Sequence, residues 1–350
     1  DAAKPFFDPT TGGGFVRAQA GTMAALTDAL RRRLGRTQLP ATALSAPDWA
    51  ASRNNPLGLA AFVEQYAKAV RAATPAERAR HMAGALVAAG ALVHILADMG
   101  SPSHVRSDTR AHLDKLGDGA DDLGSRFERV AARAYGRLGV PPAARVVTRD
   151  TLRGFFTATP AAGGAATADA PLGLADLTAA SYFSAYTLPG PFAAAHGAGS
   201  ARLARPAPVV PARLSVMSAN VPEGVALRDA RGVCLARYTA VRADVTFSLD
   251  DECMLEQITA ILPEVVAYAT GLLDYLMRGN LVVSIVEGGK VQAAGATGPV
   301  ELLAEDGRGV RTALAAGAAI PAGTVRVLAL SVGVDGRGEP LVAVGDAPVK

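Results

Sequence analysis

One long helix is the feature that most constrains the fold of this chain. Thr74-Pro75-Ala76-Glu77 has the spacing of a capping box, with proline in the first turn, where its missing N–H costs nothing. The helix is predicted to begin near residue 75 and to end near Asp98, with Gly100 as its C-terminal stop. Alanine and glycine dominate residues 83–91, so neighbouring helices can approach closely. We therefore expect a central, buried helix.

The end of this helix carries side chains of the metal-ligand type. His94 and Asp98 are four residues apart and share a helix face, and His104 follows a break at Gly100 and Pro102. Imidazole and carboxylate groups together suit zinc, and an aspartate can bridge two ions. An isolated His-x-x-x-Asp pair is more often a buried histidine hydrogen-bonded to a carboxylate. The third histidine behind the turn favours a zinc site.

The pattern His94-x-x-x-Asp98-x-x-x-Pro102-x-His104 resembles the core ligand motif of the zinc-dependent phospholipases C and the related fungal single-strand-specific zinc nucleases. Other segments resemble the same family in the same order, particularly its divergent bacterial members. These segments are Phe6–Gly12, His104–Asp108, Gly124–Glu128 and Leu262–Glu264 with Gly271–Gly279. The resemblance covers roughly residues 5 to 279 and implies an exported zinc-dependent phosphodiester hydrolase.

The resemblance also implies roles for individual residues. A cluster of one to three zinc ions would polarise the phosphoryl oxygens and activate water. His94 and Asp98 would hold the first pair of ions, with Asp98 bridging and catalytic, while His104 and Glu128 would hold another ion. The substrate would be a phospholipid or another phosphodiester.

This chain departs from the family pattern at several positions. The family has a ligand histidine where this chain has Gly124, so Asp108 and His112 are alternative ligands. Pro5 stands where the family has another zinc histidine, and an aspartate further upstream has no counterpart. Asp8 is better explained as a turn-forming Asp-Pro. We expect weak or no phosphodiesterase activity from residues 1–350 alone. The alternative is a non-catalytic helical scaffold whose residual metal site serves in binding or assembly.

Composition limits the partners and the compartment. The formal net charge is only +3 over 350 residues, and no basic cluster with interleaved aromatics occurs, so no specific nucleic acid is indicated. Apolar runs are broken before about 18 residues, which predicts no transmembrane segment. The chain begins at Asp1 without a signal peptide, so we expect a processed protein that is secreted, periplasmic or on the cell surface, or else a trimmed one. Cys234 and Cys253 would form a disulfide after export and remain thiols otherwise. The sequence leaves any protein partner unknown.

The predicted fold class is mainly α, a zinc phospholipase C-like helical domain, with a small C-terminal all-β sandwich. The helical domain covers residues 1–279, with 156–249 rich in loops and short strands, and the sandwich covers 280–350. Further helices are expected over about 120–138, with Glu128 in the middle, and about 250–277. Gly279-Asn280 is expected to be a linker. Strands are expected at 214–217, 225–228, 233–238, 281–286, 290–293, 300–304, 310–314, 325–332 and 341–344.

Overall fold

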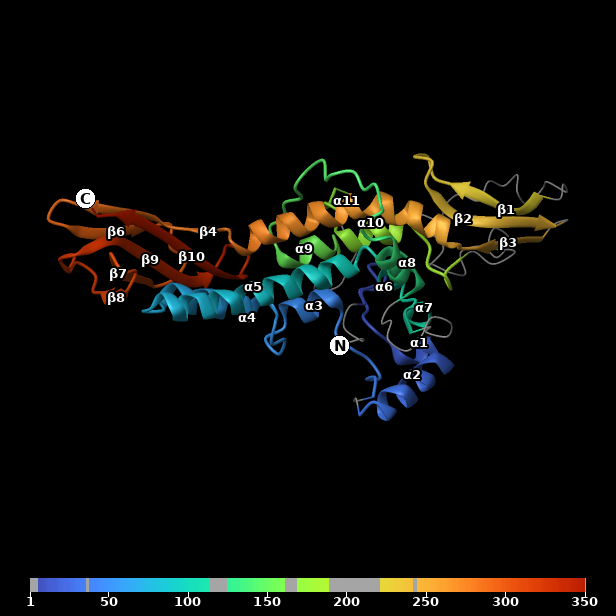
Figure 1. Cartoon of the computed structure of the whole chain (residues 1–350), viewed down its shortest axis with the longest axis horizontal. Helices are drawn as coiled ribbons and strands as arrows, with labels where there is room; N and C mark the ends of the chain where they lie inside the picture. The colour runs from blue at the N-terminus through green and yellow to red at the C-terminus, as the bar shows by residue number, and fades with distance from the viewer. Residues whose placement is uncertain are drawn as a thin grey trace. The chain divides into compact units, whose positions relative to one another are not determined.

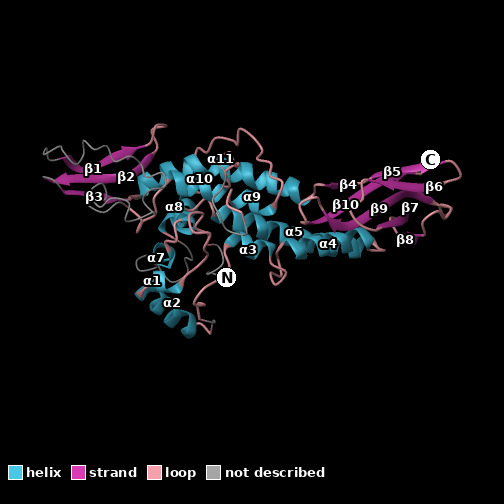
Figure 2. Ribbon diagram, turned by 180° about the vertical axis from the view of Figure 1, so that it is seen from behind, coloured by secondary structure: helices cyan, strands magenta, loops and turns pink. Residues whose placement is uncertain are grey.

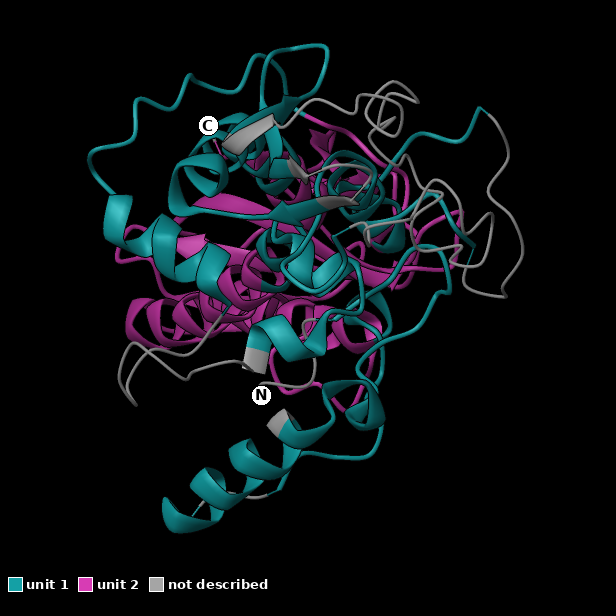
Figure 3. Ribbon diagram, turned by 90° about the vertical axis from the view of Figure 1, so that its right-hand side faces the viewer, with its two compact units in different colours: residues 1–48, 95–146, 153–269 teal, residues 49–94, 147–152, 270–350 magenta. Residues whose placement is uncertain are grey.

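The computed structural model describes residues 6–35, 38–113, 125–160, 169–188, 221–241 and 244–349. The chain forms two compact units, which Figure 3 colours separately. The first unit contains residues 1–48, 95–146 and 153–269, and the second contains residues 49–94, 147–152 and 270–350. The predicted boundary between residues 279 and 280 stays a prediction.

The predicted fold class is wrong, because the chain is mixed α/β and not mainly α with a single sandwich. Helix makes up 41% and strand 22% of the structure. The described residues form sheets of three, five and two strands as well as eleven helices (Figure 2). Two causes explain the difference. Strands within residues 221–248 pair into a sheet of their own, and the C-terminal strands divide between two sheets.

The helices are labelled in Figure 1. In the described residues they are α1 (Arg17–Ala20), α2 (Thr22–Arg33), α3 (Ala46–Ala51), α4 (Leu59–Arg71), α5 (Pro75–Asp98), α6 (Pro102–Val105), α7 (Thr109–Leu113), α8 (Arg126–Ala134), α9 (Leu152–Phe156), α10 (Leu174–Ser181) and α11 (Asp251–Leu276). The predictions of helices at 75–98 and at about 250–277 are therefore confirmed by α5 and α11.

Helix α5 begins with the predicted capping box. The Thr74 backbone N–H donates to Oε2 of Glu77, and the Glu77 N–H donates to Oγ1 of Thr74. The expectation of a buried helix is wrong, because only 28% of its most apolar 18-residue window is buried. By length and composition α5 is long and apolar enough to cross a membrane, and it is the one such helix among the described residues. One helix of this kind is weak evidence, so the absence of a transmembrane segment stays a prediction.

The second unit contains the C-terminal strands. They are β4 (Gly279–Asn280), β5 (Val282–Val286), β6 (Lys290–Ala294), β7 (Val300–Asp306), β8 (Arg311–Leu314), β9 (Thr324–Val334) and β10 (Pro340–Pro348). The strands predicted after residue 281 are confirmed. The linker predicted at Gly279-Asn280 is wrong, because these residues pair in parallel with Ala343 and Val344 of β10.

The five-stranded sheet has the order β4-β10-β9-β7-β8, while β5 and β6 form a separate hairpin. Leu302–Glu305 and Val327–Ser331 are buried without alternation, as expected for strands that are covered on both faces. The hairpin contributes Val291 to the apolar core of the sheet. Helix α4 packs against β9 and β10.

The first unit contains the other sheet, in the order β1 (Val221–Arg228), β2 (Cys234–Val241) and β3 (Asp244–Ser248). The strands expected at 225–228 and 233–238 are confirmed, whereas the one expected at 214–217 lies outside the described residues. A disulfide between Cys234 and Cys253 joins β2 to the first turn of α11, which resolves the alternatives left open for these cysteines. Helix α8 packs on α11 through Val130, Met254 and Ile258.

Candidate metal centre

His104, the first residue of the candidate centre, is positioned by a close contact between Gly100, which follows α5, and Val265 in α11. A Cβ atom at Gly100 would lie 2.6 Å from Cγ2 of Val265 in α11, so only glycine permits this approach without a shift. The chain then turns, and Pro102 occupies the start of α6, where its missing N–H is tolerated. His104 follows in the same turn, and its side chain is only 1% exposed.

Helix α7 carries the second residue, His112, whose side chain is 11% exposed. The helix is fixed by Asp108. Oδ1 of Asp108 accepts from the Ala111 N–H at 3.0 Å, and Oδ2 accepts from the Tyr186 N–H at 2.9 Å. Both oxygens of Asp108 therefore accept hydrogen bonds from backbone N–H groups. Of the two alternative ligands, His112 belongs to the candidate centre and Asp108 does not.

Helix α8 carries the third residue, Glu128, in its first turn. The prediction of Glu128 in the middle of a helix is wrong, because α8 begins at Arg126; residues 120–124 of the expected helix lie outside the described residues. Ser125 and Glu128 form a capping box. Oε2 of Glu128 accepts from the Ser125 N–H at 2.7 Å, and Oγ of Ser125 accepts from the Glu128 N–H at 3.3 Å. The box fixes the direction of the Glu128 carboxylate.

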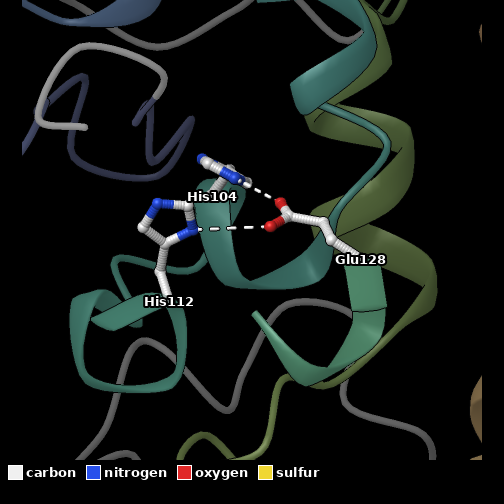
Figure 4. Close-up of side chains that lie close together, drawn as sticks. All are labelled: His104, His112 and Glu128. Carbon is white, nitrogen blue, oxygen red and sulfur yellow. Dashed lines mark hydrogen bonds and ion pairs between the residues drawn. The ribbon is translucent and has the colours of Figure 1, made fainter. Parts of the chain in front are cut away.

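Figure 4 shows the two imidazole rings on one side of this carboxylate, each directed at a different oxygen. Nε2 of His104 lies 2.6 Å from Oε1 of Glu128, and Nδ1 of His112 lies 3.6 Å from Oε2. One ligand atom from each residue lies within 4.8 Å of the others. Side chains from three short helices thus converge on a single point.

The N-terminal segment packs against this group. The Phe6 ring centroid lies 4.9 Å from that of His104 and 5.0 Å from that of His112. The Phe7 N–H donates to the His104 carbonyl oxygen at 3.0 Å. Asp8 forms the turn that its Asp-Pro sequence predicts, because Oδ1 accepts from the Thr10 N–H at 2.9 Å. Its Oδ2 accepts from Ser107 Oγ at 3.0 Å, and Asp8 is not part of the group.

The electrostatics of the group favour an ionised carboxylate. Burial by itself would raise the pKa of Glu128. The nearby charge and hydrogen bond of His104, the charge of His112 and the Ser125 N–H outweigh burial and lower this pKa to about 2. Glu128 is therefore a carboxylate over the whole physiological range, as a metal ligand must be.

Two imidazole nitrogens and one carboxylate oxygen are a set that suits zinc, and three protein ligands leave the fourth position for water or substrate. The 2.6 Å between Nε2 of His104 and Oε1 of Glu128 is shorter than the roughly 3.3 Å that separates two ligands of one tetrahedral zinc. A zinc ion would therefore replace this hydrogen bond after a small outward movement of the two side chains. By chemistry and position the residues fit the metal.

The first predicted pair of ligands, His94 and Asp98, lies outside this group of three residues. His94 is exposed in the last turns of α5 and Asp98 is its last residue, so their predicted position in the helix is confirmed. Neither belongs to the group formed by His104, His112 and Glu128. The assignment of His94 and Asp98 as ligands, with Asp98 catalytic, stays a prediction.

One signal in the sequence was missed. Ser125-Arg126-Phe127-Glu128 has the spacing of a capping box and would have located both the start of α8 and the orientation of Glu128. Nothing in the sequence around His112 distinguishes it from a solvent-exposed histidine, because its place in the candidate centre depends on contacts with residues distant in the sequence.

Comparisons of the chain with protein-family models, with curated proteins and with solved structures found no match.

Proposed function

We propose that this protein is a zinc-dependent phosphodiester hydrolase of the phospholipase C kind, with His104, His112 and Glu128 as ligands. The observation that carries the proposal is the convergence of these three side chains within 4.8 Å. The sequence resemblance to zinc phospholipases C supports the class of reaction. The Cys234–Cys253 disulfide supports an oxidising compartment and therefore export.

The protein's own residues would hold and orient the metal. When bound, zinc would polarise a phosphoryl oxygen and lower the pKa of water at the site. The Phe6 ring packs against both histidine rings and limits their movement. Ser125 holds one oxygen of Glu128, which leaves Oε1 directed toward the metal position. This fixed arrangement reduces the reorganisation needed when the metal binds.

A second function, a non-catalytic scaffold used in binding or assembly, is favoured by one observation. Both oxygens of Glu128 already accept hydrogen bonds, one from His104 and one from the Ser125 N–H. This arrangement satisfies both oxygens of the half-buried carboxylate without any ion.

Zinc-dependent turnover of bis(p-nitrophenyl) phosphate separates the two functions. We expect weak hydrolysis that is lost in EDTA, restored by zinc and reduced to the metal-free level in His104→Ala, since that variant lacks a direct ligand. His81→Ala is the matched control, because His81 contacts Gln65 in the second unit. Zinc binding without turnover, or the absence of zinc binding, would overturn the hydrolase and support the scaffold.

A further inference from the structure

The second unit contains a cavity of about 480 Å³, which is lined by α4, α5 and the loop before α4. The residues of its wall lie between Arg53 and Ala88, and none of them belongs to the candidate metal centre. The volume falls within the range of small-molecule sites. The cavity is therefore a second candidate site, whose ligand has to be inferred from its own wall.

The loop that forms one side of the cavity is held in place by its own hydrogen bonds. The Asn55 side-chain nitrogen donates to the Trp49 carbonyl oxygen at 3.1 Å, and the Asn55 side-chain oxygen accepts from the Leu57 N–H at 3.0 Å. A Cβ atom at Gly58 would lie 2.8 Å from the Ala50 carbonyl oxygen, so the loop packs closely on the preceding helix. A wall that is already ordered costs little conformational entropy when a ligand binds.

Most of the wall is apolar and aliphatic. The two larger apolar side chains, Leu57 and Val87, are 41% and 58% exposed. Between them the wall is made of small residues, Ala60 and Ala61 of α4 and Gly84 and Ala88 of α5. An aliphatic group in the cavity would cover Leu57 and Val87 and remove apolar surface from water.

The charge of the wall is that of one cation. Its charged residues are Arg53 and Glu64. Glu64 is neutralised by Lys68, whose Nζ lies 2.5 Å from Oε1. The Arg53 side chain is exposed and has no ion-pair or hydrogen-bond partner within the residues that the structure describes. A ligand with a single negative charge would balance Arg53.

Uncharged N–H groups add to the arginine. Oε1 of Gln65 lies 3.1 Å from Nδ1 of His81, so the Gln65 side-chain nitrogen, which has no partner in the described part of the chain, remains as a donor. Ala60 and Ala61 lie in the first turn of α4, which has no side-chain cap and no acidic residue. Their backbone N–H groups have no acceptor inside the helix. The polar groups of the wall are therefore mainly donors.

We infer that this cavity binds a small aliphatic monocarboxylate. Arg53 would contact the carboxylate, since the planar fork of a guanidinium group matches its two oxygens. Leu57 and Val87 would contact the aliphatic group. A carboxylate carries the single charge that Arg53 balances, whereas a phosphate monoester carries about 1.5 to 2 charges at pH 7. A free acid and the C-terminus of a peptide share this chemistry.

The test is a ligand-observed NMR titration of the full chain at constant ionic strength. The ligands are hexanoate, its uncharged analogue hexanamide, acetate and N-acetyl-leucine. We expect hexanoate to bind at least roughly tenfold more tightly than hexanamide or acetate, because only hexanoate has both the charge and the aliphatic group. Tighter binding of hexanoate than of N-acetyl-leucine identifies a free acid as the ligand, and the reverse order identifies a peptide C-terminus.

Variants locate the binding. Arg53→Gln should weaken hexanoate by roughly tenfold and leave hexanamide within about twofold, since only a charge-assisted hydrogen bond is lost. Arg80→Gln, at an exposed arginine of α5 outside the wall, is the matched control and should leave both affinities within about twofold. Ala61→Leu fills the cavity and should weaken hexanoate and hexanamide alike, whereas Ala79→Leu, at an exposed position of α5, should weaken neither.

Equal hexanoate affinity in Arg53→Gln and Arg80→Gln would overturn the inference. Equal affinity of the unchanged protein for hexanoate and hexanamide would overturn it as well. Hexanamide binding by Arg53→Gln reports an intact cavity, so loss of the fold is distinguished from loss of the charge. The cavity shares no residue with the candidate metal centre, so failure of this inference leaves the zinc proposal standing.

Discussion

Nε2 of His104 lies 2.6 Å from Oε1 of Glu128, although the two residues belong to different short helices. His104 is almost fully buried, and the carboxylate is held from its other side by the Ser125 N–H. His112 adds a second imidazole on the same carboxylate at 3.6 Å. The arrangement directs two imidazole rings at one half-buried carboxylate, which is the geometry on which the proposed metal site depends.

The first prediction separates the structural group from the ligands that the sequence resemblance implies. We expect His112→Ala to weaken zinc binding by roughly 100-fold or more, because even partners of metal ligands account for 10–100-fold. His94→Ala should leave zinc affinity within about twofold, since His94 is exposed and outside the group. Competition with a fluorescent zinc chelator measures both affinities. Weaker zinc binding in His94→Ala than in His112→Ala would restore the ligand set of the resemblance.

The second prediction concerns the cap of α8. Ser125→Ala removes the side-chain acceptor of the Glu128 N–H and should lower the free energy of unfolding by about 1 kcal/mol. Its backbone N–H remains and still donates to Glu128, so zinc affinity should change less than about twofold. Ser125→Asp keeps a capping acceptor and should recover most of the stability. Urea denaturation of the three proteins checks the result, and an unchanged midpoint in Ser125→Ala would show that the cap contributes nothing.

The local parts of this fold are predictable from the sequence. Helices α5 and α11 and the strands after residue 281 follow from capping residues, apolar runs and glycine turns, which act over a few residues. The fold class is not predictable in the same way. The pairing of β4 with β10 depends on contacts between segments distant in the chain. Considered without these contacts, the dipeptide Gly279-Asn280 has the composition of a linker.

The candidate centre, like the fold, is only partly predictable from the sequence. His104 and Glu128 were predicted as ligands from the resemblance, and the structure brings them together. The sequence gives no reason to prefer His112 over Asp108 as a metal ligand, because both lie shortly after His104. Only the packed structure separates them: Asp108 is used by backbone N–H groups, whereas the ring of His112 lies 4.5 Å from that of His104.

The third prediction concerns pH and the ion pairs of Glu305 in the second unit. Glu305 lies 2.6 Å from Nε of Arg311 and 2.5 Å from Nη2 of Arg326, with 8% of its side chain exposed. Burial raises the pKa of Glu305, but the hydrogen bonds and charges of the two arginines outweigh it and lower the pKa below its ordinary value of 4.5. The unfolded chain therefore takes up the proton first as the pH falls. The stability from this group is complete above about pH 4.5 and is lost on further acidification.

Glu305→Gln should lower the free energy of unfolding at pH 7 by about 1.5–3 kcal/mol, the range for hydrogen bonds to charged groups. It should also flatten the loss of stability between about pH 5 and pH 3. Glu287→Gln, in the exposed turn between β5 and β6, is the control. Urea midpoints across this pH range measure the effect. A slope in Glu305→Gln equal to that of the control would refute the assignment.

The fourth prediction concerns the Cys234–Cys253 disulfide, which joins β2 to the first turn of α11 across a separation of 19 residues. A cross-link that closes a loop of this size contributes about 3 kcal/mol by restricting the unfolded chain. Other contacts hold the same junction, since Glu256 accepts from the Cys234 N–H and Gln257 donates to the Cys234 carbonyl oxygen. Reduction should therefore loosen β1–β3 without unfolding α11.

Hydrogen exchange followed by mass spectrometry should show faster exchange in β2 after treatment with a phosphine reductant, and unchanged exchange in β7 of the second unit. Cys234→Ser with Cys253→Ser should reproduce the effect without reductant. Equal exchange in β2 before and after reduction would mean that the strand is held by its hydrogen bonds alone.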